Sequence, residues 1–337
     1  MSATATGAPP TTRRVTGLLA LAGVLALLAA LSVALGSRAM GLAEVWSGLT
    51  DAASDAYPVV TELRLPRTAL GLAAGAALGL AGALMQAMTR NPLADPGLLG
   101  VNTGASAAVV TAAHFIGISS FTGTLVFAFA GAAAASVACY LIAGAAGATP
   151  ARLALAGAAV TAAGYAYVSA VQLLDTATLE QMRFWSVGSL ITAHTVPLPP
   201  VIGLVIAAGV AGVLLARPLN ALALGDATAT GLGVDPRVLR VAGVTAITVL
   251  AGTATAACGP IVFVGLVVPH VVRAYTGPDQ KWVLPYSMLT GAVFLLAADV
   301  LGRLVARPSE LQVGIVCAVV GGPFFLYLIS RKKVARL

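Results

Sequence analysis

The sequence predicts an all-α polytopic membrane protein with ten transmembrane helices and with both termini in the cytoplasm. Of its 337 residues, 59% are hydrophobic and only 9% are charged, whereas a soluble domain carries about 25% charged residues. The uncharged runs are far longer than the roughly 10-residue alternating segments of a membrane β-barrel. Helices therefore remain as the structure that satisfies backbone hydrogen bonds inside hydrocarbon.

The helices are expected wherever about 20 apolar residues occur together, the length needed to cross a bilayer. The predicted spans are 15–36, 67–88, 98–117, 121–143, 152–173, 196–215, 239–257, 260–275, 283–302 and 312–330. Together residues 15–337 form a single transmembrane domain, preceded by a disordered cytoplasmic tail over residues 1–14. The start TTRRVTGLLALAG is similar to a twin-arginine export signal, but its apolar run is long enough to span and the cleavage site is weak. A retained first helix is the favoured interpretation.

Charge distribution indicates whether the short eighth segment is a separate span. This segment is expected to start at Gly259-Pro260, with proline in the first helical turn. With ten spans, 13 of the 19 Lys and Arg residues lie inside and six outside. If 239–275 were one kinked span, nine would lie inside and ten outside. The positive-inside rule favours ten spans and also accounts for the net charge of +7 without nucleic acid.

Small and reactive residues within the spans indicate packing more than chemistry. Gly71, Gly75 and Gly79 form a stripe along the second span where another helix can approach closely, mainly within one bundle. The three cysteines lie in apolar runs without a C-x-x-C spacing, and the three histidines are dispersed, so no metal site is expected. These residues are Cys139, Cys258, Cys317, His114, His194 and His270.

Charged residues inside the spans are few, and each is a candidate for function. Asp299 and Arg303 are four residues apart and share a helix face, either as a local ion pair or with Arg303 as part of an outer docking site. A proton-driven secondary transporter would be expected to place more carboxylates or histidines within its spans. No lysine follows a glycine as a P-loop requires, so any ATP is used by a partner chain.

Two polar islands lie between spans. In TELRLPRTALG, Leu65 precedes a proline and is expected to be extended. Arg64 and Arg67 there suit either carboxylates of a visiting protein or snorkelling at the interface. In the inner segment 217–237, one or two short helical turns with an apolar side are expected from Leu219, Leu222, Ala223 and Asp226. Such a segment suits either the bilayer surface or a groove on another protein.

The stretch RNPLADPGLLGVNTGA, residues 90–105, predicts a rigid non-helical bridge on the inner face. Asn91-Pro92 and Asp95-Pro96 both favour turns. Asp95 is expected to cap the third span with Pro96 in its first turn. Such stiffness between two spans suits a constriction.

These residues resemble a known family, the FecCD-type permeases of type II ABC importers for ferric siderophores, haem and cobalamin. The resemblance covers about residues 60–330 and rests on several motifs in the same order. They are LRLPR, GALMQAMTRNPLADPGLLGVNTGA, FWSVGSL, LNALALGDATATGLGV, GPIVFVGLVVPHVVR, and ADVLGR followed by GGPFFLYLI. The loop GPDQKW departs from the family pattern, outside the positions that concern function.

The resemblance implies a role for each of several positions. The cytoplasmic gate would be formed by Asn91 and Leu93, and Arg64, Arg67 and Arg303 would dock the binding protein. The translocation pathway would be lined by Thr161, Gly164, Tyr165 and Val168. The contact core for the ATPase would be Leu222, Leu224, Gly225, Asp226 and Ala229. His270 is expected to serve architecture.

The resemblance also implies the partners and the activity. The chain would be the non-enzymatic translocation subunit in the cell membrane, importing an iron–siderophore complex or, alternatively, haem or cobalamin. It would bind no cofactor, because ATP and Mg would be used by two partner ABC ATPase subunits. An extracytoplasmic substrate-binding protein, a second permease (identical or a close paralogue) and membrane lipid are the other expected partners.

Overall fold

The computed structural model describes residues 10–118, 120–144 and 149–330, which are helical and contain no strand. The α-helices are α1 (Thr11–Ala34), α2 (Leu42–Thr50), α3 (Leu65–Thr89), α4 (Val101–Thr111), α5 (Phe121–Ile142), α6 (Pro150–Leu174), α7 (Thr176–Trp185), α8 (Leu198–Leu214), α9 (Ala216–Ala223), α10 (Asp226–Gly231), α11 (Pro236–Cys258), α12 (Val264–Thr276), α13 (Gln280–Val305) and α14 (Val313–Ser330). Short π-helical turns cover η1 (Val59–Arg64) and η3 (Ala112–Ile116), and 3₁₀ turns cover η2 (Pro96–Leu99) and η5 (Ile191–Thr195).

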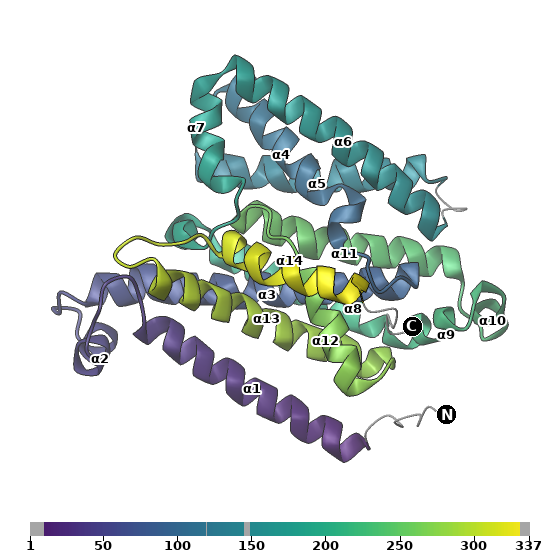
Figure 1. The fold of residues 1–337 in the computed structure, drawn as a ribbon, viewed down its shortest axis with the longest axis horizontal. Helices are drawn as coiled ribbons and strands as arrows, with labels where there is room; N and C mark the ends of the chain where they lie inside the picture. The colour runs from purple at the N-terminus through teal and green to yellow at the C-terminus, as the bar shows by residue number, and fades with distance from the viewer. Residues whose placement is uncertain (1–9, 119, 145–148, 331–337) are drawn as a thin grey trace.

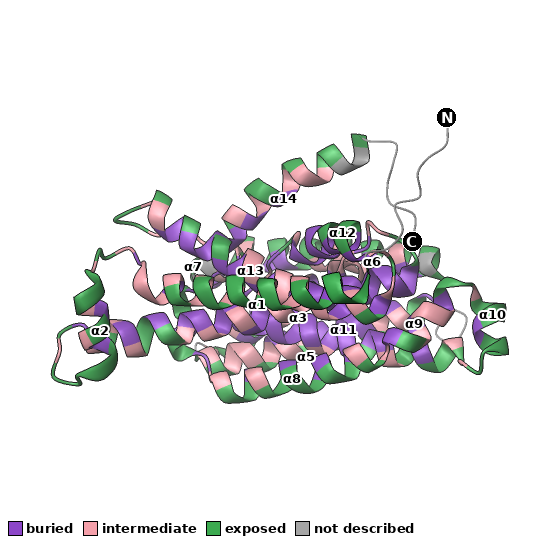
Figure 2. Cartoon of the chain, turned by 90° about the horizontal axis from the view of Figure 1, so that it is seen from below, coloured by how far each residue is buried: buried purple, intermediate pink, exposed green. Residues whose placement is uncertain are grey.

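The long helices run roughly parallel around α3, which is the centre of the bundle (Figure 1). In the apolar stretch that includes α3, 83% of residues are buried, against 6% in α1 at the edge of the bundle. The helix α14 lies on the opposite side of the molecule from α5 and α8 (Figure 2). Helices α4 and α6 form a second group with α7 at one end (Figure 1).

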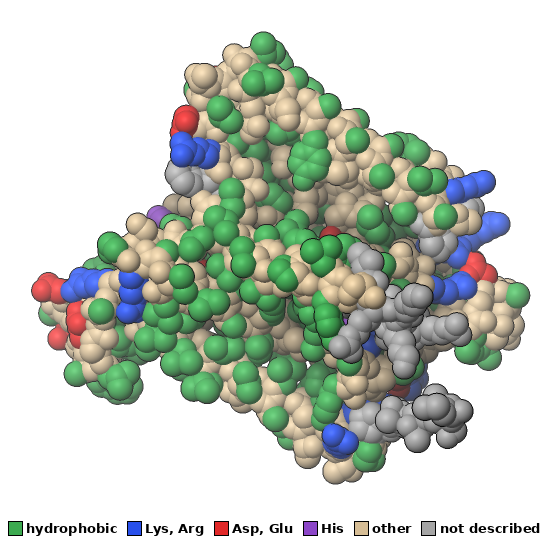
Figure 3. Space-filling view, in the orientation of Figure 1, with side chains coloured by type: hydrophobic (Ala, Val, Ile, Leu, Met, Phe, Trp, Pro, Cys, Tyr) green, Lys and Arg blue, Asp and Glu red, His purple; other side chains and the backbone are tan. Residues whose placement is uncertain are grey.

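Each of the ten predicted spans overlaps one of these helices, and the multi-pass architecture is confirmed. Among the described residues, six helical stretches are long and apolar enough to cross a membrane, and a seventh would be α8 together with α9, bent by 45°. The helices α4 with η3, α12 and α14 are shorter. The number ten therefore stays a prediction. Charged side chains gather towards opposite ends of the molecule (Figure 3), and α1 begins at the end that carries α9 and α10 (Figure 1).

The glycine stripe on α3 brings two helices into backbone contact. A Cβ on Gly75 would lie 2.5 Å from the carbonyl oxygen of Gly291, and one on Gly79 would lie 2.2 Å from that of Ser287. Both partners belong to α13. The stripe thus serves packing within one chain, as the sequence favoured, and all three cysteines are likewise buried and unpaired.

Helix α1 is attached to the bundle at its two ends. At its last turn the Arg64 guanidinium donates to the carbonyls of Val33 and Ala34, both at 2.8 Å. At its first turn the Tyr286 hydroxyl donates to the carbonyl of Arg14 at 2.6 Å. Between these points its side chains are exposed or half-buried (Figure 2).

Three local expectations were wrong. Leu65 is helical (φ −64°, ψ −49°), because the π-helical turn η1 runs directly into α3 and the two form one continuous helix. The helix of the eighth span starts at Val264 instead of Pro260, since Phe263 has a left-handed backbone (φ 71°) that interrupts it. The predicted tail 1–14 is too long: α1 begins at Thr11, and residues 1–9 lie outside the described residues.

Candidate functional site

The loop after α3 is a tightly hydrogen-bonded turn, as predicted. The Asn91 side-chain oxygen accepts from the Leu93 amide at 3.0 Å, and the Asp95 carboxylate accepts from the Gly97 amide at 2.8 Å. Asp95 therefore caps the short turn η2 that precedes α4, and burial raises the pKa of its carboxyl group. Asn91 is exposed and Leu93 is half-buried, so the two expected gate residues lie on a rigid loop.

The inner segment 217–237 folds into α9 and α10, which confirms the predicted short helices. Its apolar side packs on its own chain, because Leu219 and Leu222 are fully buried. A bilayer surface or a groove on another protein, the two partners that the sequence left open for this segment, would therefore meet it through other side chains. The large apolar side chains that α9 and α10 leave exposed are Leu224 and the following Leu232, at 66% and 62%.

The five residues expected to contact the ATPase differ in their exposure. Leu222 and Ala229 are fully buried and support the turn from inside, whereas Leu224 is available to a partner. Gly225 sits between the two helices with φ 108°, a backbone that a side chain would strain. Asp226 begins α10 and is exposed, but it already has two partners in this chain.

Those partners are arginines from two other parts of the same end of the molecule. One carboxylate oxygen of Asp226 pairs with Arg90, the residue before the loop that carries the expected gate residues Asn91 and Leu93 (the gate loop). The other pairs with Arg240 of α11 at 2.5 Å. Burial would raise the pKa of Asp226, but the hydrogen bonds and charges of Arg240 and Arg90 outweigh it and hold the pKa below its ordinary range.

Of the four expected pathway residues on α6, Tyr165 is the one that lines a cavity. Its side chain is 58% exposed. Val168 is buried, and Gly164 packs against Thr103, whose methyl group would lie 2.5 Å from an added Cβ. Thr161 is half-buried. Gly164 and Val168 thus face their own chain, which does not fit direct contact with cargo.

The cavity beside Tyr165 lies between α6 and α14 and has a volume of about 480 Å³. It is lined by Asn102, Tyr165, Ser186, Val187, Pro260, Val262, Gly314, Ile315, Ala318 and Val319. No charged side chain lines it. Sequence reasoning missed Asn102, whose amide oxygen accepts from the Thr255 hydroxyl at 2.9 Å; a lone amide at the start of an apolar run was the available signal.

At the opposite end of the molecule, the expected docking arginines lie in a buried ionic network. The Arg67 guanidinium donates to Asp299 at 2.8 Å and to Glu310 at 2.5 Å. Arg303 pairs with Asp299 at 2.9 Å, which confirms the predicted ion pair on one face of α13. Burial would raise the pKa of Glu310, but the hydrogen bond and charge of Arg67 outweigh it and lower the pKa.

The same three arginines are not exposed. Arg64, Arg67 and Arg303 are 5%, 8% and 2% exposed, and all three donate to groups of their own chain. Direct contact with a visiting protein is therefore a prediction that this geometry does not support. Arg38 and Arg307 are exposed at this end; Arg64 donates to the carbonyl of Arg38 at 2.8 Å and so positions it.

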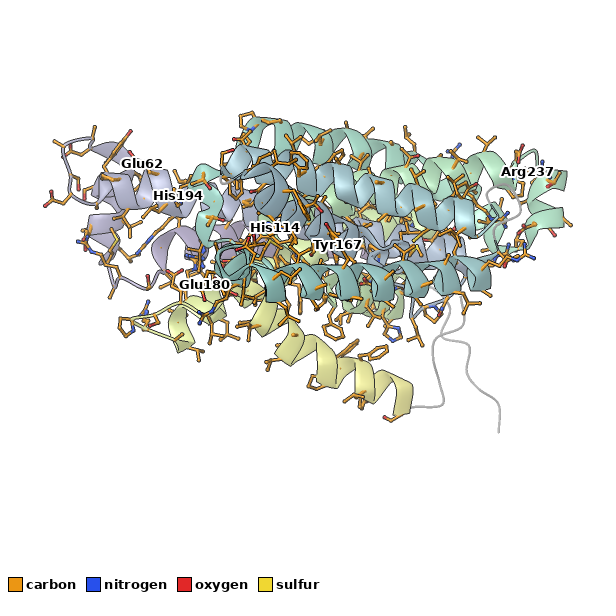
Figure 4. The ribbon with its side chains drawn as sticks, turned by 90° about the horizontal axis from the view of Figure 1, so that it is seen from above. Glu62, His114, Tyr167, Glu180, His194 and Arg237 are labelled. Carbon is orange, nitrogen blue, oxygen red and sulfur yellow. The ribbon has the colours of Figure 1, made fainter. Side chains whose placement is uncertain are left out.

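A further polar pair at this end was missed from the sequence. His114 Nδ1 lies 2.8 Å from the carboxylate of Asp175, which also accepts from the Thr178 hydroxyl at 2.5 Å. The bonds from Thr178 and His114 hold the pKa of Asp175 far below its ordinary value. Glu62 and His194 lie at one end of the molecule and Arg237 at the other (Figure 4).

Comparison with known proteins places this architecture in a family. The FecCD transport family model matches residues 24–331. The chain is 44% identical to the ferric enterobactin transport system permease protein FepD of Escherichia coli (94% of this chain, 97% of that protein) and 36% identical to the hemin transport system permease protein HmuU of Yersinia pestis (93% and 95%). It is 35% identical to the cobalamin import system permease protein BtuC of Halobacterium salinarum (84% and 76%).

The fold agrees with this assignment. A solved metal-chelate type ABC transporter in an inward-facing conformation superposes with a TM-score of 0.82 at 27% identity, covering 94% of this chain and 99% of that one. The matched proteins are multi-pass membrane permeases of ABC import systems, in which ATP hydrolysis belongs to a separate subunit. The chain belongs to the FecCD transport family and is a membrane permease subunit of an ABC importer.

Proposed function

We propose that this permease imports an iron–siderophore complex across the cell membrane. Relatives named for ferric enterobactin and Fe(3+)-citrate are 44% and 43% identical, against 36% for the hemin permease and 35% for the cobalamin permease. The observation that carries the proposal is the uncharged cavity between α6 and α14. Walls without fixed charge hold a chelate weakly, which suits a pathway that must release its cargo.

The cavity is open on the face formed by α6 and α14, and this face is proposed to meet a second permease. Small side chains dominate the exposed part of α6, including Ala158, Ala162, Ala166 and Ala170, and they allow close helix approach. Two copies, or this chain with a close paralogue, would then enclose one pathway with Tyr165 on each wall. Thr161 lies about one turn before Tyr165 on the same helix and completes this wall.

The inner end is proposed to bind two ATPase subunits that use ATP and Mg. Leu224 and Leu232 provide exposed apolar contacts on the segment of α9 and α10, and Leu222, Gly225 and Ala229 hold its shape. Asn91 and Leu93 are proposed to open and close the inner exit. The pathway itself needs no cofactor.

The outer end is proposed to receive cargo from an extracytoplasmic binding protein. Exposed Arg38 and Arg307 are suited to its carboxylates, with Arg64, Arg67 and Arg303 acting as positioning residues behind them. Arg38 already pairs with Glu44 at 3.0 Å with both side chains well exposed, and an exposed pair of this kind exchanges partners at little cost.

The test is reconstitution with the partner ATPase and binding protein in proteoliposomes, with a panel of ferric siderophores, haem and cobalamin. ATP-dependent uptake of a ferric siderophore is expected. If only haem or only cobalamin is taken up, that compound is the cargo and the proposal of a ferric siderophore is wrong. A proton-coupled secondary transporter is the distant alternative, and it predicts uptake driven by a pH gradient without ATPase. The double substitution Arg38→Glu/Arg307→Glu is expected to weaken docking, and unchanged docking would refute the role of these arginines.

A further inference from the structure

The carboxylate of Asp226 joins two segments that the sequence assigned to different tasks. Asp226 opens α10, within the segment proposed to bind the ATPase, and Arg90 is bonded covalently to Asn91 of the gate loop. The ion pair between Asp226 and Arg90 therefore connects residues 136 positions apart in the chain. The other oxygen of the same carboxylate is held by Arg240 at the start of α11.

The two halves of this arrangement differ in exposure. The Arg240 side chain is 13% exposed, whereas those of Arg90 and Asp226 are 37% and 47% exposed. Because water screens exposed pairs more strongly than partly buried ones, Arg240 holds Asp226 more firmly than Arg90 does. The carboxylate is thus anchored on α11 and offers its second oxygen to the gate loop.

The backbone at Arg90 makes this contact act directly on the loop. Arg90 has a left-handed conformation (φ 49°, ψ 35°), which a non-glycine residue adopts at a cost. The Asn91 amide still bonds to the carbonyl of Gln86 at 3.2 Å, and the Ala94 amide to that of Asn91 at 3.1 Å. Because these backbone hydrogen bonds keep the loop rigid, a displacement of Arg90 would move the loop with Asn91 and Leu93 as a unit.

We infer that Asp226 is a positioning residue that links the ATPase-binding segment to the gate loop, with Arg90 as its partner and Arg240 as its anchor. This inference rests on the proposed function of those two segments and changes one expected role within it. Asp226 faces its own chain's arginines, and the exposed Leu224 is the residue available to the ATPase. Movement of α10 would reach Asn91 and Leu93 through this carboxylate.

The first experiment compares the complete reconstituted transporter with Arg90→Gln and Asp226→Asn versions. Transport per ATP hydrolysed is expected to fall by up to roughly fivefold, which corresponds to the contribution of an exposed ion pair, while ATP hydrolysis stays close to that of wild type. The conservative variant Arg90→Lys is expected to keep most of the transport per ATP hydrolysed, because it retains a cation opposite the Asp226 carboxylate and leaves the pair with Arg240 intact. Arg237→Gln is the matched control, since Arg237 is an exposed arginine at the same end with no side-chain bond among the described residues (Figure 4).

Two results overturn the inference. Equal transport per ATP in all variants means that the pair transmits nothing. Equal loss of hydrolysis and transport in Asp226→Asn alone, without effect of Arg90→Gln, makes Asp226 an ATPase contact instead.

A second measurement does not depend on transport. Spin labels at Leu93→Cys and Thr228→Cys in the chain in lipid nanodiscs report the distance between gate loop and α10. Asp226→Asn should broaden that distance distribution and Arg237→Gln should leave it narrow; identical distributions in both refute the link. A wild type that shows the narrow distribution but no ATP-dependent uptake would refute the proposed function and leave the physical link standing.

Discussion

The substitution Asp299→Asn is expected to destabilise the end of the bundle opposite α9 and α10 more than any exposed ion-pair change. Asp299 is fully buried and pairs with both Arg67 and Arg303, at 2.8 and 2.9 Å. The described network otherwise holds one carboxylate, that of Glu310, which bonds Arg67. Neutralising Asp299 would leave Arg303 buried without a carboxylate partner at hydrogen-bond distance.

The magnitude follows from the cost of an uncompensated buried charge. Breaking a buried pair by removing one partner costs about 3–5 kcal/mol. Asparagine keeps one oxygen that can still accept from a guanidinium, which places the expected loss near the lower end, about 3 kcal/mol. The matched control is Glu44→Gln, because its pair with Arg38 has side chains 57% and 39% exposed and contributes at most about 1 kcal/mol.

The assay is the free energy of unfolding from titration of the purified chain in mixed micelles with a denaturing detergent. The two variants should differ by about 2 kcal/mol or more, with Asp299→Asn the less stable. A loss for Asp299→Asn no larger than that for Glu44→Gln would refute the reading of this network as a structural anchor. It would also reopen Asp299 as a proton carrier, the role that a secondary transporter requires.

Two more perturbations test packing and titration. Gly82→Ala would place a Cβ 2.0 Å from the carbonyl oxygen of Gly265, so it should lower the free energy of unfolding by about 1–3 kcal/mol in the same titration. The control Gly23→Ala, with no atom within 4 Å of the added Cβ, should be neutral or slightly stabilising. Equal effects of the two substitutions would contradict the close approach of α3 and α12. Because Arg67 lowers the folded-state pKa of Glu310 below its ordinary 4.5, the stabilisation by Glu310 is complete above that pH and is lost as pH falls through the lowered value. Wild type should therefore melt higher than Glu310→Gln at pH 6, and the gap should shrink below about pH 4; a gap independent of pH would exclude the ion pair as its cause.

Sequence patterns predicted the helices well because each follows from local composition. The predicted spans overlap the helices, and Asp95 caps a turn as its neighbour Pro96 suggested. The pair of Asp299 and Arg303 was also predictable, since residues four apart on a helix are neighbours. Arg67 was assigned to a partner protein because nothing local indicates its contact with a residue 232 positions away.

The candidate site was harder to predict for the same reason. Residue patterns predicted the turn after α3 and the two short helices α9 and α10, but neither these patterns nor the resemblance distinguished side chains that face the chain from those that could face a partner. Val168 and Leu222 turned inward, while Leu224 and Tyr165 stayed exposed. That distinction is set by how helices distant in sequence pack together, which periodicity in runs rich in alanine and glycine does not record.

The attachment of α1 by its ends has an evolutionary consequence. Most of the hydrogen bonds that hold it use backbone carbonyls of α1 as acceptors for side chains elsewhere, such as Arg64 and Tyr286. The Ser32 hydroxyl, which bonds to Thr68 and Arg303, adds a side-chain contact near the end of the helix. A carbonyl is present whatever residue occupies the position. The middle of α1 can therefore vary among apolar residues without loss of the hydrogen bonds at its ends. Different lineages could thus adapt this helix to bilayers of different thickness while the rest of the importer stays constant.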